Sequence, residues 1–229
     1  QLQGILGQSF NMCAFDLPGC GHSSWTKFPE KLYNLRGYAD LISKAINTLN
    51  FDRLVLLGHS LGGHIVLRVA QKTTSLSGCV LSGTPPLPDA GSMSKGFLPS
   101  PVAEFLFKGD LSDREIEQWA QGSIVNQDVK DVIAEKIRAA DPASREYQGK
   151  SLQQDPFDNE RVLLEKLDCP VAIFHGEHDP LINYDYLKTI QHPKLWKNGV
   201  QVIKDTGHYP FLEDPRQFNQ RLMEFLSTC

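Results

Sequence analysis

Residues 58–63 read Gly-His-Ser-Leu-Gly-Gly and stand between a continuous apolar run and an apolar helical pattern. Glycine inside a packed segment is usually destabilising, so three glycines around one serine indicate a backbone bent too sharply for larger residues. We interpret residues 53–71 as strand, tight turn and helix, and we expect a Cβ two residues before or after Ser60 to collide with a neighbouring element. The alternative is a glycine-rich turn in which the serine is incidental.

Short apolar runs alternate along the chain with helical periods. This order is typical of an α/β fold with a mostly parallel sheet and helices on both of its faces. Asp214 and Pro215 predict the start of the last helix, as an N-cap followed by proline at the first helical position. The strands that we predict are residues 11–15, 53–57, 78–82, 169–174 and 200–203.

A long stretch between the third and fourth predicted strands shows no strand pattern. It begins with the proline-rich sequence Gly-Thr-Pro-Pro-Leu-Pro, and Ser112 and Glu115 form a capping-box pattern for a helix within it. We therefore predict an α/β core made of residues 1–83 and 161–229. Residues 84–160 are predicted to form a helical cap over the carboxyl ends of the strands.

The composition argues against several classes of function. The chain has 229 residues, is 41% hydrophobic and 22% charged, and carries a net charge of −4, without the basic patch of a nucleic-acid-binding protein. No apolar run reaches the length of a membrane span, and no basic and then apolar leader opens the sequence. We predict a cytoplasmic protein without nucleic-acid or membrane partners; its oligomeric state does not follow from the sequence.

The cysteines are odd in number and show no metal-site spacing. Cys13, Cys79 and Cys169 sit in or beside apolar strand-like runs, and we favour reduced, buried thiols over a disulfide framework. The cysteines are Cys13, Cys20, Cys79, Cys169 and Cys229.

His175, His178 and Asp179 form a His-x-x-His-Asp cluster that raises the question of a metal. Side chains at a strand end splay in different directions, and no further ligand group stands out nearby. We predict no metal and no cofactor.

The serine of the opening motif has the surroundings of a nucleophile. Residues 58–62 match the pattern G-x-S-x-G, in which a strained strand-to-helix turn exposes the serine and the helix N-terminus directs backbone N–H groups to the same place. We predict Ser60 as the nucleophile and the N–H of Leu61 as a donor to the developing oxyanion.

A serine alcohol also needs a base, and the base needs an acid to orient it. Asp179 follows the fourth predicted strand and His208 follows the fifth, at the carboxyl strand ends where α/β sheets place their sites. We predict that Asp179 accepts from Nδ1–H of His208, and that Nε2 of His208 takes the Ser60 proton. Glu177 is the second choice of acid. A turn-forming Asp179 and a surface-loop His208 are the structural alternatives.

Three other histidines lie near these motifs. We expect His59 to pack under the turn and His64 to be an early helix residue. His22 is assigned to turn chemistry.

At these residues the chain resembles the α/β-hydrolase fold superfamily. Within it, the stretches GYADLI, GHSLGGHIVL, LSGTPP and LW…VIKDTGHYPF resemble hydrolases that degrade N-acylhomoserine lactones. The resemblance implies that a serine acyl-enzyme opens the lactone ring without a metal. Such relatives can have glutamate at the position of Asp179, and they place a tyrosine on a cap helix where this chain carries Trp119. The wider resemblance rests on residues 16–23, 58–63, 175–180 and 207–215.

The resemblance also implies a departure near the N-terminus. Family members carry a His-Gly motif after an earlier strand, and that loop supplies a second oxyanion N–H. Residues 1–10 resemble the end of the helix that follows the loop. We therefore expect the first strands and the oxyanion loop to be missing from the sequence, by truncation rather than by loss in a degenerate relative.

The sequence thus predicts a serine hydrolase of carboxylic esters or lactones, with N-acylhomoserine lactones as the narrower candidate. Its partner would be a small-molecule acyl ester or lactone. Two alternatives stay open: a ligand-binding protein on a hydrolase scaffold that has lost catalysis, and C–C bond hydrolysis or cofactor-free peroxidation on the same triad. Aromatic residues of the cap are predicted to line an apolar acyl pocket, with cap-to-core packing as the alternative: Phe97, Phe105, Phe107 and Trp119.

Overall fold

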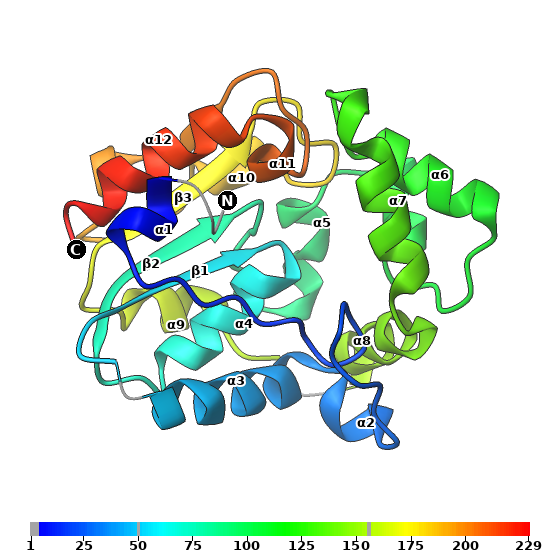
Figure 1. The fold of residues 1–229 in the computed structure, drawn as a ribbon, viewed down its shortest axis with the longest axis horizontal. Coiled ribbons are helices and arrows are strands. Elements are labelled where there is room, and N and C mark those ends of the chain that lie inside the picture. The colour runs from blue at the N-terminus through cyan, green and yellow to red at the C-terminus, as the bar shows by residue number, and fades with distance from the viewer. Residues whose placement is uncertain (1–4, 50, 155–156) are drawn as a thin grey trace.

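The computed structural model describes residues 5–49, 51–154 and 157–229. At its centre lies a parallel sheet of four strands in the order β1-β2-β3-β4 (Figure 1). The strands predicted from residue 53 onward are confirmed, with bounds shifted by a few residues. They are β1 (Leu54–His59), β2 (Leu76–Ser82), β3 (Val171–Gly176) and β4 (Gln201–Ile203).

The two central strands are buried on both faces. In β2, Cys79 and Leu81 belong to the larger hydrophobic core, whereas Val80 between them belongs to the smaller core on the other face. In β3, Ile173 belongs to the larger core and Phe174 to the smaller one. Strands covered on both sides are expected to have continuous apolar sequences, which explains why the apolar runs of the sequence predicted these strands.

Helices cover the two faces of this sheet. Figure 1 shows α3 and α4 below the sheet and α12 above it. Phe218, Leu222 and Phe225 of α12 fill the smaller core, and Asp214 caps this helix as predicted, by accepting from the Gln217 N–H at 2.8 Å. Before residue 84 and from residue 160 onward the helices are α1 (Ile5–Ser9), α2 (Pro29–Leu32), α3 (Leu35–Leu49), α4 (Leu61–Ala70), α9 (Glu160–Glu165), α10 (Tyr184–Leu187), α11 (Pro210–Glu213) and α12 (Pro215–Leu226), with a 3-10 turn at Trp196–Asn198.

Residues 84–160 run from β2 to β3 and add no strand to the sheet in their described part. The capping box at Ser112 is confirmed, because the Ser112 hydroxyl accepts from the Glu115 N–H and the Glu115 carboxylate accepts from the Ser112 N–H. The helices here are α5 (Met93–Gly96), α6 (Asp113–Gly122), α7 (Lys130–Ala139) and α8 (Pro142–Gln154), with 3-10 turns at Ala90–Ser92, Pro101–Phe105 and Gln127–Val129.

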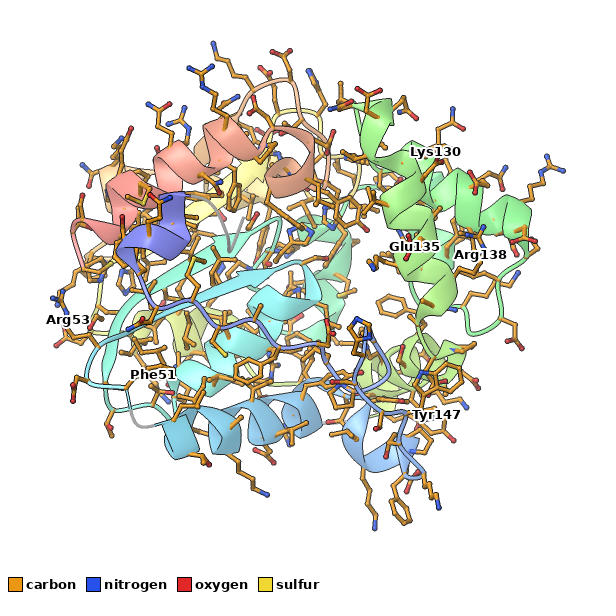
Figure 2. The ribbon with its side chains drawn as sticks, in the orientation of Figure 1. Phe51, Arg53, Lys130, Glu135, Arg138 and Tyr147 are labelled. Atoms are coloured by element: carbon orange, nitrogen blue, oxygen red, sulfur yellow. The ribbon has the colours of Figure 1, made fainter. Side chains whose placement is uncertain are left out.

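Ion pairs join α6 to α7, which stand side by side in Figure 1. Lys130 donates to Glu117 at 2.5 Å and Arg138 donates to Asp113 at 3.2 Å; Figure 2 labels both cations along α7. Exposed pairs of this kind contribute little individually, so the buried faces of the two helices are what hold them together.

The prediction of a strand at residues 11–15 is wrong. These residues form no strand, and Met12, Cys13 and Phe15 are exposed. A strand needs a hydrogen-bonding neighbour. In the described part of the chain no strand pairs with this segment, and β1 is the edge of the sheet.

The cysteines are free thiols, as predicted. Cys79 and Cys169 are buried, whereas Cys13 is exposed together with its segment. Within the described ranges, we find no helix that is both long enough and apolar enough to cross a membrane.

Candidate active site

Ser60 occupies the turn between β1 and α4, with φ 50° and ψ −118°. Non-glycine residues rarely adopt positive φ, and strain of this kind concentrates at functional sites. Two backbone hydrogen bonds hold the turn. The Ser60 N–H donates to the Ser82 carbonyl and the Gly63 N–H donates to the Ser60 carbonyl, both at 2.9 Å.

The glycines around Ser60 are not equivalent. A Cβ on Gly58 would overlap the Gly62 carbonyl oxygen, and a Cβ on Gly63 would overlap the Thr84 side chain. Gly62 itself has open space at its Cβ position. The prediction of a collision two residues to either side of Ser60 is therefore right for Gly58 and wrong for Gly62. Successive helical residues point about 100° apart, so the close approach falls on Gly63 instead.

His208 and Asp179 form a buried pair. Nδ1 of His208 lies 2.8 Å from Oδ2 of Asp179, and the two side chains are 3% and 0% exposed. The other carboxylate oxygen of Asp179 accepts from the N–H groups of Leu181 at 2.9 Å and Ile182 at 3.2 Å.

The charge state of Asp179 fixes the tautomer of His208. Burial raises the pKa of Asp179, but the charge of His208 and the hydrogen bonds from His208 and Leu181 outweigh it, so the pKa lies below the ordinary aspartate value. An ionised carboxylate only accepts, so Nδ1 of His208 carries the proton. Nε2 of the neutral ring is then left as a base.

The loop that carries His208 is fixed from both sides. The His208 N–H donates to the Ser123 carbonyl at 2.7 Å, directly after α6. Glu213 of α11 accepts from the Gly207 N–H at 2.9 Å and from the Val125 N–H at 2.7 Å. Sequence reasoning missed Glu213, although its acidic side chain six residues after Gly207 is visible in the sequence.

Glu177, the second choice of acid, lies away from His208. It is exposed and accepts from the Asp205 N–H at 3.0 Å. With His178 and Asp205 it forms an exposed cluster whose potential ligand atoms lie within 4.8 Å of one another. The geometry therefore brings Asp179, and not Glu177, against His208.

His175 and His59, both considered in the sequence analysis, pack against aromatic rings. His175 is buried and stacks on Tyr184, with ring centroids 5.2 Å apart. The His59 ring centroid lies 4.8 Å from that of His208 and 4.9 Å from that of Phe211. Burial, followed by the like charge of His208, lowers the pKa of His59 to about 3, so His59 is neutral beside His208. His22 is exposed, and its N–H donates to Asp16 in the turn, as assigned.

A cavity of about 510 Å³ opens at the turn and is lined by Ser60, Leu61 and His208. Leu61 is the first residue of α4, and the first N–H groups of a helix have no acceptor within the helix. Such groups favour negative charge at this end of the cavity.

The predicted aromatic residues divide into two sets. Phe97, Phe107 and Trp119 line the cavity. Phe105 is not among the described residues that line the cavity. The 3-10 turn Pro101–Phe105 instead directs this ring inward, where it is 8% exposed and belongs to the larger core.

His64 lines the same cavity, although no pattern in the sequence assigns it there. Its Nδ1 lies 2.8 and 2.9 Å from the two carboxylate oxygens of Glu160, which is fully buried. Arg68, one turn further along α4, donates to Glu160 at 2.7 Å and to Asp158 at 2.9 Å. The four-residue spacing of His64 and Arg68 is visible in the sequence, but their partners come some ninety residues later.

The parallel sheet, the serine turn and the buried histidine–carboxylate pair together define an α/β hydrolase. The chain belongs to the alpha/beta hydrolase family, which matches residues 2–221. Among curated proteins, the hydrolase YugF of Bacillus subtilis is 24% identical over 237 residues, which cover 97% of this chain and 82% of YugF.

Two solved structures that the chain resembles are a lactonase and an esterase. The N-acyl homoserine lactonase AidH, complexed with N-butanoyl homoserine, is 26% identical with a TM-score of 0.85, over 92% of this chain and 76% of that chain. An esterase from Exiguobacterium antarcticum is 18% identical with a TM-score of 0.72, over 92% and 79%. The second likeness shows the fold alone. The resemblance drawn from the sequence is confirmed.

Gly58 and Gly62 give a matched pair of variants on the two sides of Ser60. We expect Gly58→Ala to lower the free energy of unfolding by about 1–3 kcal/mol, because its Cβ overlaps the backbone of α4. Gly62→Ala is the control, since its site is open and alanine is favoured over glycine inside a helix by about 0.5–1 kcal/mol. Chemical denaturation measures both. Equal losses in the two variants would contradict the geometry of the turn.

His59 predicts a pH dependence of stability. Its pKa is about 3 in the folded chain against 6.5 for free histidine, so between these values the unfolded chain binds the additional proton. Stability is expected to fall as the pH drops through this window, by up to about 1.4 kcal/mol per pH unit from this residue. His59→Leu should flatten the slope by that amount in urea denaturation between about pH 6 and pH 4. A slope unchanged by the substitution would refute this account of His59.

Proposed function

We propose that this chain is a serine hydrolase of carboxylic esters and lactones that forms an acyl-enzyme on Ser60. The observation that carries the proposal is the buried His208–Asp179 pair, 2.8 Å apart, in a site where His208 and Ser60 line one cavity. Membership of the hydrolase family supports it. The esterase and lactonase structures that the chain resembles support the same reaction class.

In the first step Ser60 attacks the substrate carbonyl. Nε2 of His208 takes the proton of the Ser60 hydroxyl while Oγ bonds to the carbonyl carbon and the carbonyl electron pair moves to its oxygen. The N–H of Leu61 donates to the oxyanion that forms. Asp179 stabilises the imidazolium of His208 without taking its proton.

In the second step the oxyanion collapses and the bond to the leaving oxygen breaks. His208 returns its proton to that oxygen, and the acyl group stays on Ser60. Water then attacks this ester, with His208 as its base, and releases the acid. In a lactone the leaving oxygen is tethered to the acyl group, so one hydroxy acid is the product.

We place the acyl chain of the substrate in the cavity between the core and residues 84–160, which we interpret as the cap. Helices α6, α7 and α8 contribute Trp119, Ile133 and Leu152 to its wall, and Phe97 and Phe107 add two aromatic rings. A volume of about 510 Å³ lies within the range of small-molecule sites. N-acylhomoserine lactones are the narrower substrate class that we propose, supported by the likeness to AidH.

Hydrolysis of p-nitrophenyl butanoate tests the reaction class. We expect the wild-type chain to hydrolyse it, and Ser60→Ala to lower kcat by at least about 1,000-fold, because the remaining site has no nucleophile. Glu177→Gln is the control that we expect to keep the wild-type rate, since Glu177 lies away from His208. Equal rates for wild type and Ser60→Ala would reject the hydrolase and favour a ligand-binding protein on this scaffold.

Mass spectrometry of the products distinguishes the narrower substrate classes. With an N-acylhomoserine lactone we expect a single product heavier by one water, since ring opening keeps both halves together. Release of the free fatty acid would show amide cleavage instead, and no reaction would restrict the activity to esters.

A further inference from the structure

His64 and Ser60 both lie at the N-terminal end of α4. Ser60 is the N-cap residue of α4, and His64 is the fourth residue of the helix, within its first turn. Helical side chains lean toward the N-terminus, which inclines the imidazole of His64 toward the serine. Both residues line the cavity of about 510 Å³.

One nitrogen of His64 is held by a carboxylate that only accepts. Glu160 also accepts from Arg68 at 2.7 Å and from the Leu87 N–H at 3.0 Å. Burial raises the pKa of Glu160, but the charges and hydrogen bonds of His64 and Arg68 outweigh it, so this carboxyl is ionised. Nδ1 of His64 must therefore be the donor to Glu160, and Nε2 of the neutral ring is an acceptor.

The surroundings of the ring leave Nε2 for the cavity. Nδ1 faces Glu160, and Phe97 stacks on the ring with centroids 6.4 Å apart and planes 29° apart. The His64 side chain is 12% exposed, so the edge opposite Nδ1 is the part of the ring that remains for the cavity.

Satisfying Glu160 does not by itself require a histidine. Arg68 donates to one carboxylate oxygen, and the Leu87 N–H donates to the other. What a histidine adds at this position is a second nitrogen on the side of the ring away from Glu160, one helical turn from the nucleophile.

We propose that Nε2 of His64 accepts a hydrogen bond from an N–H or O–H group next to the carbonyl that Ser60 attacks. His64 thereby selects acyl substrates that carry such a donor, as an α-acylamino ester or lactone does. This inference rests on the proposed function of Ser60. His64 is a specificity residue and takes no part in the proton transfer between Ser60 and His208.

A matched pair of ligands tests the inference. One is α-(butanoylamino)-γ-butyrolactone, which has the amide N–H, and the other is its N-methyl analogue, which does not. Each is used as a competitor of p-nitrophenyl butanoate hydrolysis at about pH 8. The inhibition constant reports binding when the competitor is cleaved slowly compared with its dissociation, and it is the competitor's KM when cleavage is fast.

In the wild-type chain we expect the N–H lactone to bind about 5- to 10-fold more tightly than the N-methyl lactone, which is the effect of one hydrogen bond. In His64→Asn the ratio is expected to fall to about 1, because the shorter amide reaches Glu160 but not the position of Nε2. His64→Gln, whose amide reaches that position, should keep part of the preference. The ratio is unaffected by a uniform loss of activity.

Two results would overturn the inference. One is a wild-type ratio near 1, which decides the matter even if a variant folds poorly. The other is a preference for the N–H lactone that persists in His64→Asn, which would show that the bulk of the methyl group causes the preference. If wild type hydrolyses the reporter no faster than Ser60→Ala, the proposed function itself has failed, which is a distinct outcome.

Discussion

The site depends on the backbone turn at Ser60. Its positive φ is possible because Gly58 and Gly63 let α4 begin directly against β1 and against the loop after β2. That close packing places the serine hydroxyl, the N–H of Leu61 and the first turn of α4 at one end of the cavity. A larger residue at either glycine would separate these elements, so the chemistry of the site follows from a steric condition on the backbone.

Around this turn the chain sets two histidine–carboxylate pairs with different roles. Asp179 holds His208 at the carboxyl end of the sheet, and we assign that pair to proton transfer. Glu160 holds His64 on α4, and we assign that pair to substrate selection. In both pairs the carboxylate is buried and takes hydrogen bonds from backbone N–H groups as well. In our proposal, one device, an ionised acceptor that fixes a tautomer, serves two purposes in one cavity.

Much of the fold and part of the site could be predicted, because the features concerned are decided locally. The apolar run before Ser60 and the Asp214–Pro215 start of α12 carry their own signals. Residues 11–15 look like a strand, but pairing depends on a neighbour elsewhere in the chain. Similarly, α8 buries only Ser144 and Gly149 and so shows no apolar period. The contact of His64 with Glu160 spans 96 residues and leaves no local pattern.

The central claim is that His208 makes the Ser60 hydroxyl nucleophilic, and covalent labelling tests it most directly. The intact chain would be treated with a fluorophosphonate, digested and sequenced by mass spectrometry. The account predicts the label on Ser60 in the wild-type chain, and a rate of labelling at least about 100-fold lower in folded His208→Ala, which lacks the general base. A folded wild-type chain that leaves Ser60 unlabelled, or a rate that His208→Ala does not change, would contradict it.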